Sequence, residues 1–175
     1  MLEKRSKNSN MLKYRKGAIL AIVGIVILAN FCFPMTAIAT TQDLQINSTA
    51  GYTIEARFSY DETKNIEVIR ESGRGKTQAI DSLVVSFYNP AGEMIASYDN
   101  ITDGIATGEY FEFNFDPTTQ QLLGEIDLGG ESAGEMYLKG EVDRELSLIE
   151  IDASGEEKAI DVVRSREIGR RGEGE

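Results

Sequence analysis

The chain has 175 residues, a formal net charge of −11 at neutral pH, no histidine and one cysteine, Cys32. Without histidine it cannot form a Ser-His-Asp triad or a Cys-His pair, and zinc and haem sites lose their usual ligands. The negative charge would repel nucleic-acid phosphates, so no nucleic-acid partner is expected. Carboxylates, lysine and tyrosine can still perform acid–base chemistry, which leaves carboxylate-based catalysis open.

Residues 1–39 have the three parts of an export signal. A basic start is followed by a 17-residue stretch, 17–33, that is apolar apart from Asn30. The small residues of Ala37-Ile38-Ala39 then match a signal-peptidase site, which predicts cleavage before Thr40 and a secreted or periplasmic product. The alternative is an uncleaved leader that anchors the protein, so that the membrane is contacted only through this segment. The apolar stretch is short against the roughly 20 residues that span a bilayer, which favours cleavage.

Removing 39 of the 175 residues leaves 136, which is enough for one domain with its own core. The leader holds one of the 29 acids and six of the 18 bases, so the remaining 28 acids and 12 bases give a formal charge of −16. Because Cys32 lies in the leader, no disulfide can hold the domain together. We expect an N-terminal extension over 40–50, the domain over 51–165 and a disordered, charged tail over 166–175.

Apolar and polar residues alternate along most of the chain from residue 51 onward. Phe111, Phe113 and Phe115 alternate with Glu112 and Asn114, a period of two that is typical of a strand with one buried face. Turn sequences such as NPAG at 89–92 separate these segments. Strands are expected at 52–60, 66–70, 81–88, 93–98, 111–115, 122–128, 135–142, 146–151 and 158–163. About nine short strands predict an all-β fold, an antiparallel β-sandwich or open barrel, preceded by an N-terminal signal helix.

Carboxylates are the first candidates for chemistry. Glu112 projects from the aromatic strand, and Glu125 and Asp127 project from the segment expected to pair with it. Two acids about 5–10 Å apart can hydrolyse a glycosidic bond, so a carbohydrate hydrolase is one alternative function. The chain has no tryptophan, a common platform for sugar rings, and nothing in the sequence marks one acid pair above the others.

Calcium is the expected ligand if a metal binds, because it takes six to eight oxygen ligands from carboxylates and carbonyls. The candidate ligands are Asp99, Asn100 and Asp103 in one segment and Asp61 and Glu62 in another. Neither segment has the alternating acids and terminal glutamate of the twelve-residue calcium loop. No other cofactor is expected.

Tyrosines are expected either to pack on the strand faces or to form a surface patch. The tyrosines in question are Tyr52, Tyr88, Tyr98, Tyr110 and Tyr137.

Three segments, SFYNPAG at 86–92, FNFDPTTQ at 113–120 and IDLGG at 126–130, resemble those of uncharacterised exported β-domain proteins of cyanobacteria. Some of those proteins carry a C-terminal sorting segment with a Pro-Glu-Pro motif, which this chain lacks. The resemblance covers residues 51–151 and implies export and a β-domain, with no activity or functional residue to transfer.

The sequence therefore predicts a non-enzymatic binding or structural module of the cell envelope or exterior. Its partner would be an unknown protein or a carbohydrate. The alternatives are the carboxylate-based carbohydrate hydrolase and a calcium-dependent adhesion or binding module.

Overall fold

A computed structural model describes residues 39–164 and 168–170. The expected signal helix and nearly all of the leader lie outside these residues. The described part is all-β, with one short 3-10 turn, η1 (Glu62–Lys64), and no helix long and apolar enough to cross a membrane. The strands are β1 (Ala39–Asn47), β2 (Thr53–Asp61), β3 (Ile69–Ser72), β4 (Gly75–Lys76), β5 (Ile80–Tyr88), β6 (Met94–Thr102), β7 (Ile105–Ala106), β8 (Glu112–Asp116), β9 (Gln121–Leu122), β10 (Glu125–Gly129), β11 (Met136–Glu141), β12 (Glu145–Ile151), β13 (Glu157–Arg164) and β14 (Ile168–Arg170).

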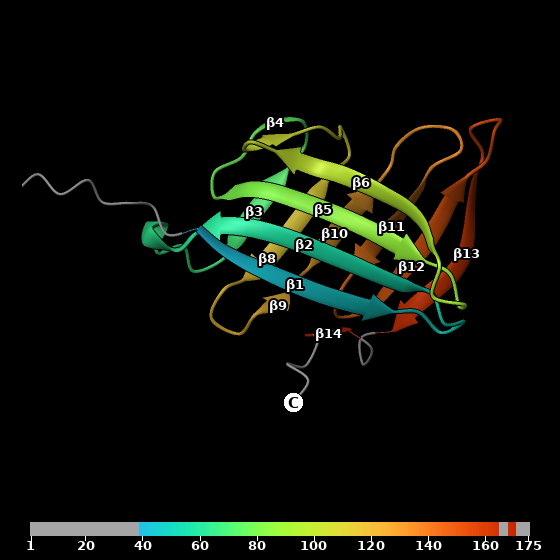
Figure 1. The fold of residues 1–175 in the computed structure, drawn as a ribbon, viewed down its shortest axis with the longest axis horizontal. Helices are drawn as coiled ribbons and strands as arrows, with labels where there is room; N and C mark the ends of the chain where they lie inside the picture. Colours follow the sequence, from blue (N-terminus) through green and yellow to red (C-terminus); the bar gives the residue numbers. More distant parts are fainter. Residues whose placement is uncertain (1–38, 165–167, 171–175) are drawn as a thin grey trace, which may run out of the picture. The chain divides into compact units, whose positions relative to one another are not determined.

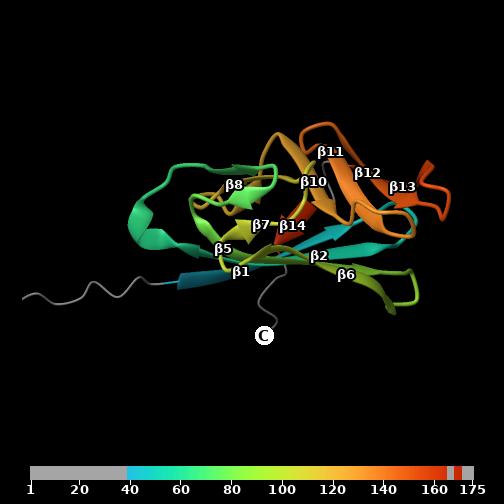
Figure 2. The same cartoon turned by 90° about the horizontal axis from the view of Figure 1, so that it is seen from above.

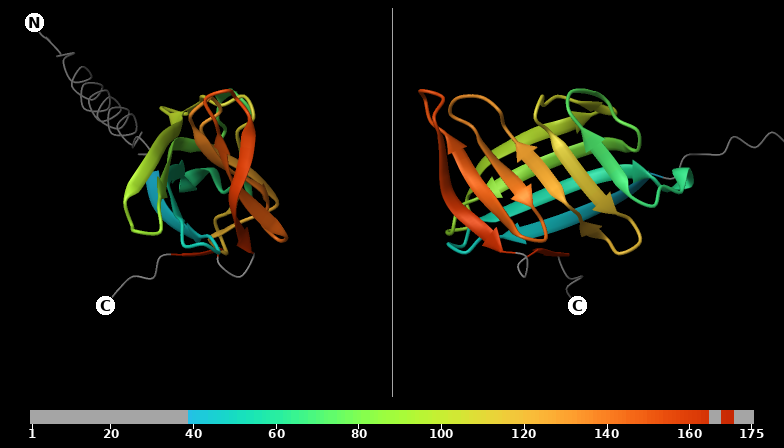
Figure 3. Two further views of the ribbon diagram at one scale, coloured as in Figure 1. Left: turned by 90° about the vertical axis from the view of Figure 1, so that its right-hand side faces the viewer. Right: turned by 180° about the vertical axis from the view of Figure 1, so that it is seen from behind.

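The strands form two antiparallel sheets that do not close into a barrel. Sheet A, which faces the viewer in Figure 1, has the order β14-β1-β2-β5-β6-β7-β4. Sheet B, seen in the right-hand view of Figure 3, has the order β13-β12-β11-β10-β8-β3, with β9 paired to β8. Figure 2 shows the two sheets as separate layers. The fold is therefore sandwich-like, and each sheet has an inner and an outer face.

The nine expected strands all have counterparts in the structure, with ends shifted by a few residues. The segment 122–128 is divided, because β9 and β10 pair separately with β8 and Gly124 turns the chain between them at a positive φ of 53°. The short β4 and β7 were not expected, because two residues are too few to show a period.

The expected N-terminal extension over 40–50 is wrong as an account of this segment. Residues 39–47 form β1, which pairs with β2 from Ala39 opposite Asp61 to Asn47 opposite Thr53. Only Leu44 and Ile46 of β1 are buried, so the segment is too polar for its alternation to stand out in the sequence.

The expected disordered tail over 166–175 is also wrong in part. Residues 168–170 form β14, which pairs with Leu44–Ile46 at the edge of sheet A. The remaining residues of the predicted tail lie outside the described part. This strand, IGR, has only three residues, which is too few to show an alternation that would predict it.

Aromatic side chains fill the space between the sheets. Phe58 of sheet A packs edge-on against Phe113 and Phe115 of sheet B, with ring centroids 5.0 and 4.8 Å apart. Such edge-to-face geometry adds about 0.5–1.5 kcal/mol to the burial of the rings. All three phenylalanines are fully buried. Apolar residues alternate with polar ones along β2 and β8, so each strand directs its apolar side chains toward the other sheet.

Polar contacts also join the two sheets. Glu71 of β3 is 5% exposed, and its carboxylate accepts hydrogen bonds from the backbone N–H groups of Gln78 and Ala79, just before β5, at 2.7–3.0 Å. Asp161 of β13 accepts hydrogen bonds from the Thr49 hydroxyl and the Ala50 N–H, both at 2.8 Å, in the turn between β1 and β2. A carboxylate that accepts several N–H groups is strongly bonded, so these residues hold loops of sheet A against strands of sheet B.

We expect Phe113→Ala to lower the free energy of unfolding by about 3–5 kcal/mol, because it removes a ring from the centre of the intersheet packing. Urea denaturation of the full chain would measure the change. The control is Ile105→Ala at a half-exposed position, where we expect a loss of about 0.5 kcal/mol or less. Equal losses for the two variants would contradict the assigned core, and Phe113→Leu provides a milder substitution if the alanine variant does not fold.

Candidate functional site

Three charged residues lie side by side on the outer face of sheet B. Asp127 of β10 is directly opposite Glu112 of β8 on one side and Lys139 of β11 on the other. Directly opposed residues of neighbouring strands share a face, and their Cβ atoms are about 4.5–5.5 Å apart. The pairing of β8, β10 and β11 therefore brings together side chains that lie 27 positions apart at the extremes, 112 and 139.

Asp127 and Lys139 form an ion pair in which the carboxylate is buried and the lysine is not. The Lys139 Nζ lies 3.0 Å from the Asp127 Oδ2, and the two side chains are 54% and 11% exposed. Burial raises the pKa of the Asp127 carboxyl, Lys139 opposes this, and the charges of Glu131 and Glu112 add to the rise. The hydrogen bond to Asp127 raises the pKa of Lys139 as well, partial burial opposes this rise, and the charge of Asp127 adds to it. Lys139 therefore offsets only part of the rise in the pKa of Asp127 that burial causes.

A small pocket of about 130 Å³, which we name the outer pocket, adjoins this pair. Tyr137 and Ile151 are buried there, although neither belongs to the core between the sheets. Burial raises the pKa of Tyr137 to about 12, and its hydrogen bond with Glu157 and the charge of Glu157 act in the same direction. The outer pocket is lined by Tyr110, Asp127, Gly130, Glu131, Tyr137, Lys139, Ile151 and Glu157. It thus combines an apolar base with carboxylates, a phenol and an ammonium group.

Tyr110 stands at the rim of the outer pocket on a loop that Glu131 holds in place. The Glu131 carboxylate accepts hydrogen bonds from the N–H groups of Glu109 and Tyr110, both at 2.8 Å. A Cβ at Gly108 would lie 2.5 Å from the Glu131 Oε1, so the glycine permits this close approach. Tyr110 remains 68% exposed although its backbone is fixed. An aromatic ring held in water beside a polar pocket is available to a ligand.

No protein-family model, curated protein or solved structure matches this chain. A function for it must therefore be argued from the geometry of the site.

Two of the three carboxylates expected from the sequence lie together. Glu112 and Asp127 are cross-strand neighbours, whereas Glu125 is paired with Glu141 of β11 at the end of the same face. Lys139 and Glu131 carry no sequence pattern that marked them as site residues. The signal that could have indicated Lys139 was its position two residues after Tyr137, which places the two side chains on the same face of the strand.

The three calcium ligands expected at 99–103 lie in different environments in the structure. Asn100 is 3% exposed, and its side-chain amide donates to the Gly129 carbonyl oxygen at 2.7 Å and accepts from the Gly129 N–H at 3.0 Å. Asp99 is exposed on β6, and Asp103 is exposed in the next turn at a positive φ of 50°. The side chain of Asn100 thus ties β6 of sheet A to β10 of sheet B.

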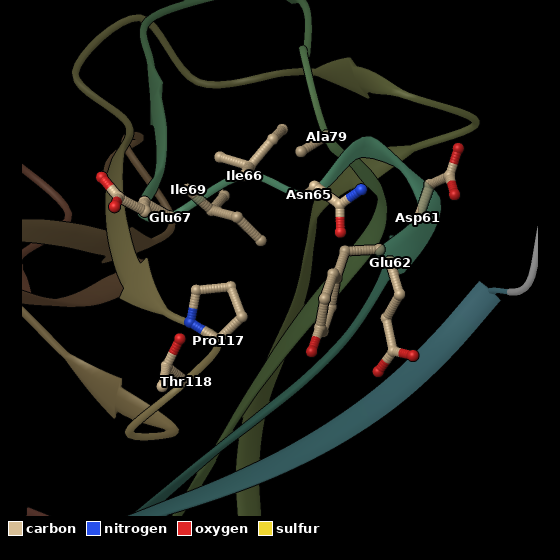
Figure 4. A pocket seen from close by; sticks show the side chains of 10 residues that line it. Asp61, Glu62, Asn65, Ile66, Glu67, Ile69, Ala79, Pro117 and Thr118 are labelled. Carbon is tan, nitrogen blue, oxygen red and sulfur yellow. The ribbon is translucent and has the colours of Figure 1, made fainter.

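Asp61 and Glu62 lie where β2 ends and η1 begins. Asp61 caps this turn by accepting hydrogen bonds from the N–H and hydroxyl groups of Thr63, and the hydroxyl bond is the first cause of its lowered pKa. Figure 4 shows the carboxylates of Asp61 and Glu62 pointing in different directions. Within residues 39–164 and 168–170, no three acidic side chains form a group that would hold a metal ion. Calcium binding stays a prediction from composition.

The tie between Asn100 and Gly129 can be tested against a calcium role. Asn100→Asp removes the donor to the Gly129 carbonyl and places a charge in a buried position, so we expect a loss of about 1–3 kcal/mol in the free energy of unfolding. Thermal and urea denaturation with calcium and with chelator would measure it. The control is Asp99→Asn at the exposed neighbouring position. Loss of stability in Asn100→Asp both with calcium and with chelator supports the tie. If calcium restored the stability of this variant, Asn100 would be assigned to a metal site.

Lys139→Met tests the electrostatics of the ion pair. Because Lys139 lowers the pKa of Asp127, its removal should raise that pKa further, as read from the side-chain carboxyl signal in an NMR titration. An acid whose pKa is raised by folding contributes stability below its unfolded pKa, and this contribution is lost as the pH rises through the folded pKa. The variant should therefore lose more stability than the wild type from about pH 4 upward. Lys158→Met, at an exposed position outside the pocket, is the control, and identical behaviour of both variants would contradict the assignment.

Proposed function

We propose that this protein is an exported, non-enzymatic binding module that holds a neutral, polyhydroxylated ligand, the chemistry of a carbohydrate, on the outer face of sheet B. The observation that carries the proposal is the outer pocket, where Tyr110, with a fixed backbone and an exposed ring, lines the same space as the Asp127–Lys139 ion pair. An aromatic face can stack on the carbon side of a sugar ring, and charged groups can bond its hydroxyls. Ligand sites commonly combine apolar walls with a few fixed polar groups in this way.

The size and charge of the outer pocket restrict the ligand. Its volume of about 130 Å³ is below the roughly 300–1,000 Å³ of most small-molecule sites, so it would seat one unit of a longer ligand. Three carboxylates and a single lysine line it, and this negative balance disfavours anionic polysaccharides. A neutral glycan chain that crosses the sheet face fits both limits.

Hydrolysis is the second candidate function, because Glu112 and Asp127 are opposed across β8 and β10. Directly opposed residues have Cβ atoms about 4.5–5.5 Å apart, which allows two carboxyl groups to approach each other, and the raised pKa of Asp127 suits a proton donor. Binding is favoured because the Asp127 carboxylate is engaged by Lys139 at 3.0 Å, an ion pair that opposes the rise in the pKa of this acid. Glu112 also does not line the outer pocket.

Export forms part of the proposal and rests on the leader. Cleavage before Thr40 would remove only Ala39 from β1, so the edge of sheet A would remain paired. A cysteine-free domain would not depend on the thiol–disulfide state of its compartment. The alternative is an uncleaved leader that anchors the protein to a membrane.

The proposal predicts that neutral polysaccharides such as a glucan, a xylan or a mannan retard the protein in affinity electrophoresis. Tyr110→Ala should weaken binding to the polysaccharide that retards it by about two- to tenfold, since aromatic contacts contribute about 0.5–1.5 kcal/mol. The change should hardly affect folding, because the side chain is mostly in water. Tyr88→Ala, on the outer face of sheet A, is the matched control.

Two outcomes would overturn this function. Absence of retardation by any neutral polysaccharide, or retardation unchanged in Tyr110→Ala, would remove the outer pocket as a glycan site. Release of reducing ends by the wild type, lost in Asp127→Asn, would replace binding with hydrolysis.

A further inference from the structure

A second pocket, which we name the end pocket, opens where the two sheets part at one end of the fold. It is formed by the end of β2, the η1 turn, the start of β3 and the turn between β8 and β9 (Figure 4). Its volume of about 310 Å³ lies at the lower limit of small-molecule sites. It shares no residue with the outer pocket, so it is independent of the proposed function.

The walls of the end pocket are apolar. Ile69 and Ala79 are almost fully buried, and Ile66 is half-buried against the core between the sheets. Tyr60 continues this surface, and its ring lies 6.1 Å from that of Phe115 in the core. The end pocket is therefore a place where the core reaches the surface, and an apolar ligand group would be shielded from water there.

The rim of the end pocket is acidic. Figure 4 shows Glu67 on one side and Asp61 and Glu62 on the other, with the isoleucines between them. Among the lining residues that the structure describes there is no lysine or arginine. The nearby Lys64 donates to the Gln78 carbonyl oxygen at 2.6 Å, so its ammonium group is engaged elsewhere. The rim therefore favours a positive charge.

An organic cation fits this arrangement better than a metal ion. Calcium requires six to eight oxygen ligands around one point, whereas here the isoleucines separate Glu67 from Asp61 and Glu62. A primary ammonium ion with an apolar stem can place its stem against the isoleucines and its charge at the rim. We propose that the end pocket binds such a ligand, an alkyl- or arylammonium ion.

Titration of the full chain with n-hexylammonium, followed by amide NMR, tests the proposal. We expect saturable shifts confined to residues of the end pocket, with no such shifts from hexanoate and weaker binding of 1-hexanol. Glu62→Gln and Glu67→Gln should each weaken hexylammonium binding by about two- to fivefold, as exposed charge pairs do. Glu150→Gln, at an exposed position outside the pocket, should leave it unchanged.

A second pair of variants tests the cavity itself. Thr118→Trp places a large ring at the exposed rim and should abolish the saturable shifts. Thr119→Trp makes the same change one residue away, outside the lining, and should preserve them. The proposal is overturned if hexylammonium binds Thr118→Trp as well as the wild type, or if its shifts spread over acidic residues generally. Equal binding of 1-hexanol would overturn the requirement for a positive charge.

Discussion

The packing of Phe58 against Phe113 and Phe115 is the contact on which the rest of this structure depends. Residues 40–175 contain no cysteine, so no disulfide can join the two sheets, and their apolar faces must do so. These rings provide the centre of that contact, with centroids about 5 Å apart. The core between the sheets then leaves the outer face of sheet B free to carry polar side chains.

The intersheet contacts also position the candidate site. Asn100 of sheet A holds both backbone groups of Gly129 in β10, two residues from Asp127. A Cβ on Gly129 would lie 2.5 Å from the Met136 carbonyl oxygen, and its φ of 132° suits glycine. The glycine therefore lets β11 approach β10 closely where Tyr137 and the outer pocket begin. A residue considered as a calcium ligand thus acts through backbone hydrogen bonds that support a different site.

Local sequence patterns predicted the strands best where one face is wholly apolar. Phe111, Phe113 and Phe115 show this pattern, and β8 was expected almost at its observed ends. β1 was missed because Leu44 and Ile46 alone mark its buried face, while its other residues are polar at an edge.

For the site, alternation placed Glu112 and Asp127 on exposed faces, but it could not indicate that Lys139 would neighbour Asp127. That contact depends on the register of β10 against β11, which no local period encodes.

The amino-acid sequence by itself determined the all-β class and the exclusion of histidine and cysteine chemistry from the domain, because both follow from composition and local periodicity. Only the tertiary structure decided which exposed residues meet. Glu131 holds the backbone of Tyr110 across 21 positions of sequence, and Asp127 lies between side chains from two other strands. The end pocket likewise exists only because β2, β3 and the turn after β8 converge where the sheets part. Such contacts arise from strand pairing and loop docking between segments distant in sequence, and these are set by the packing of the whole domain.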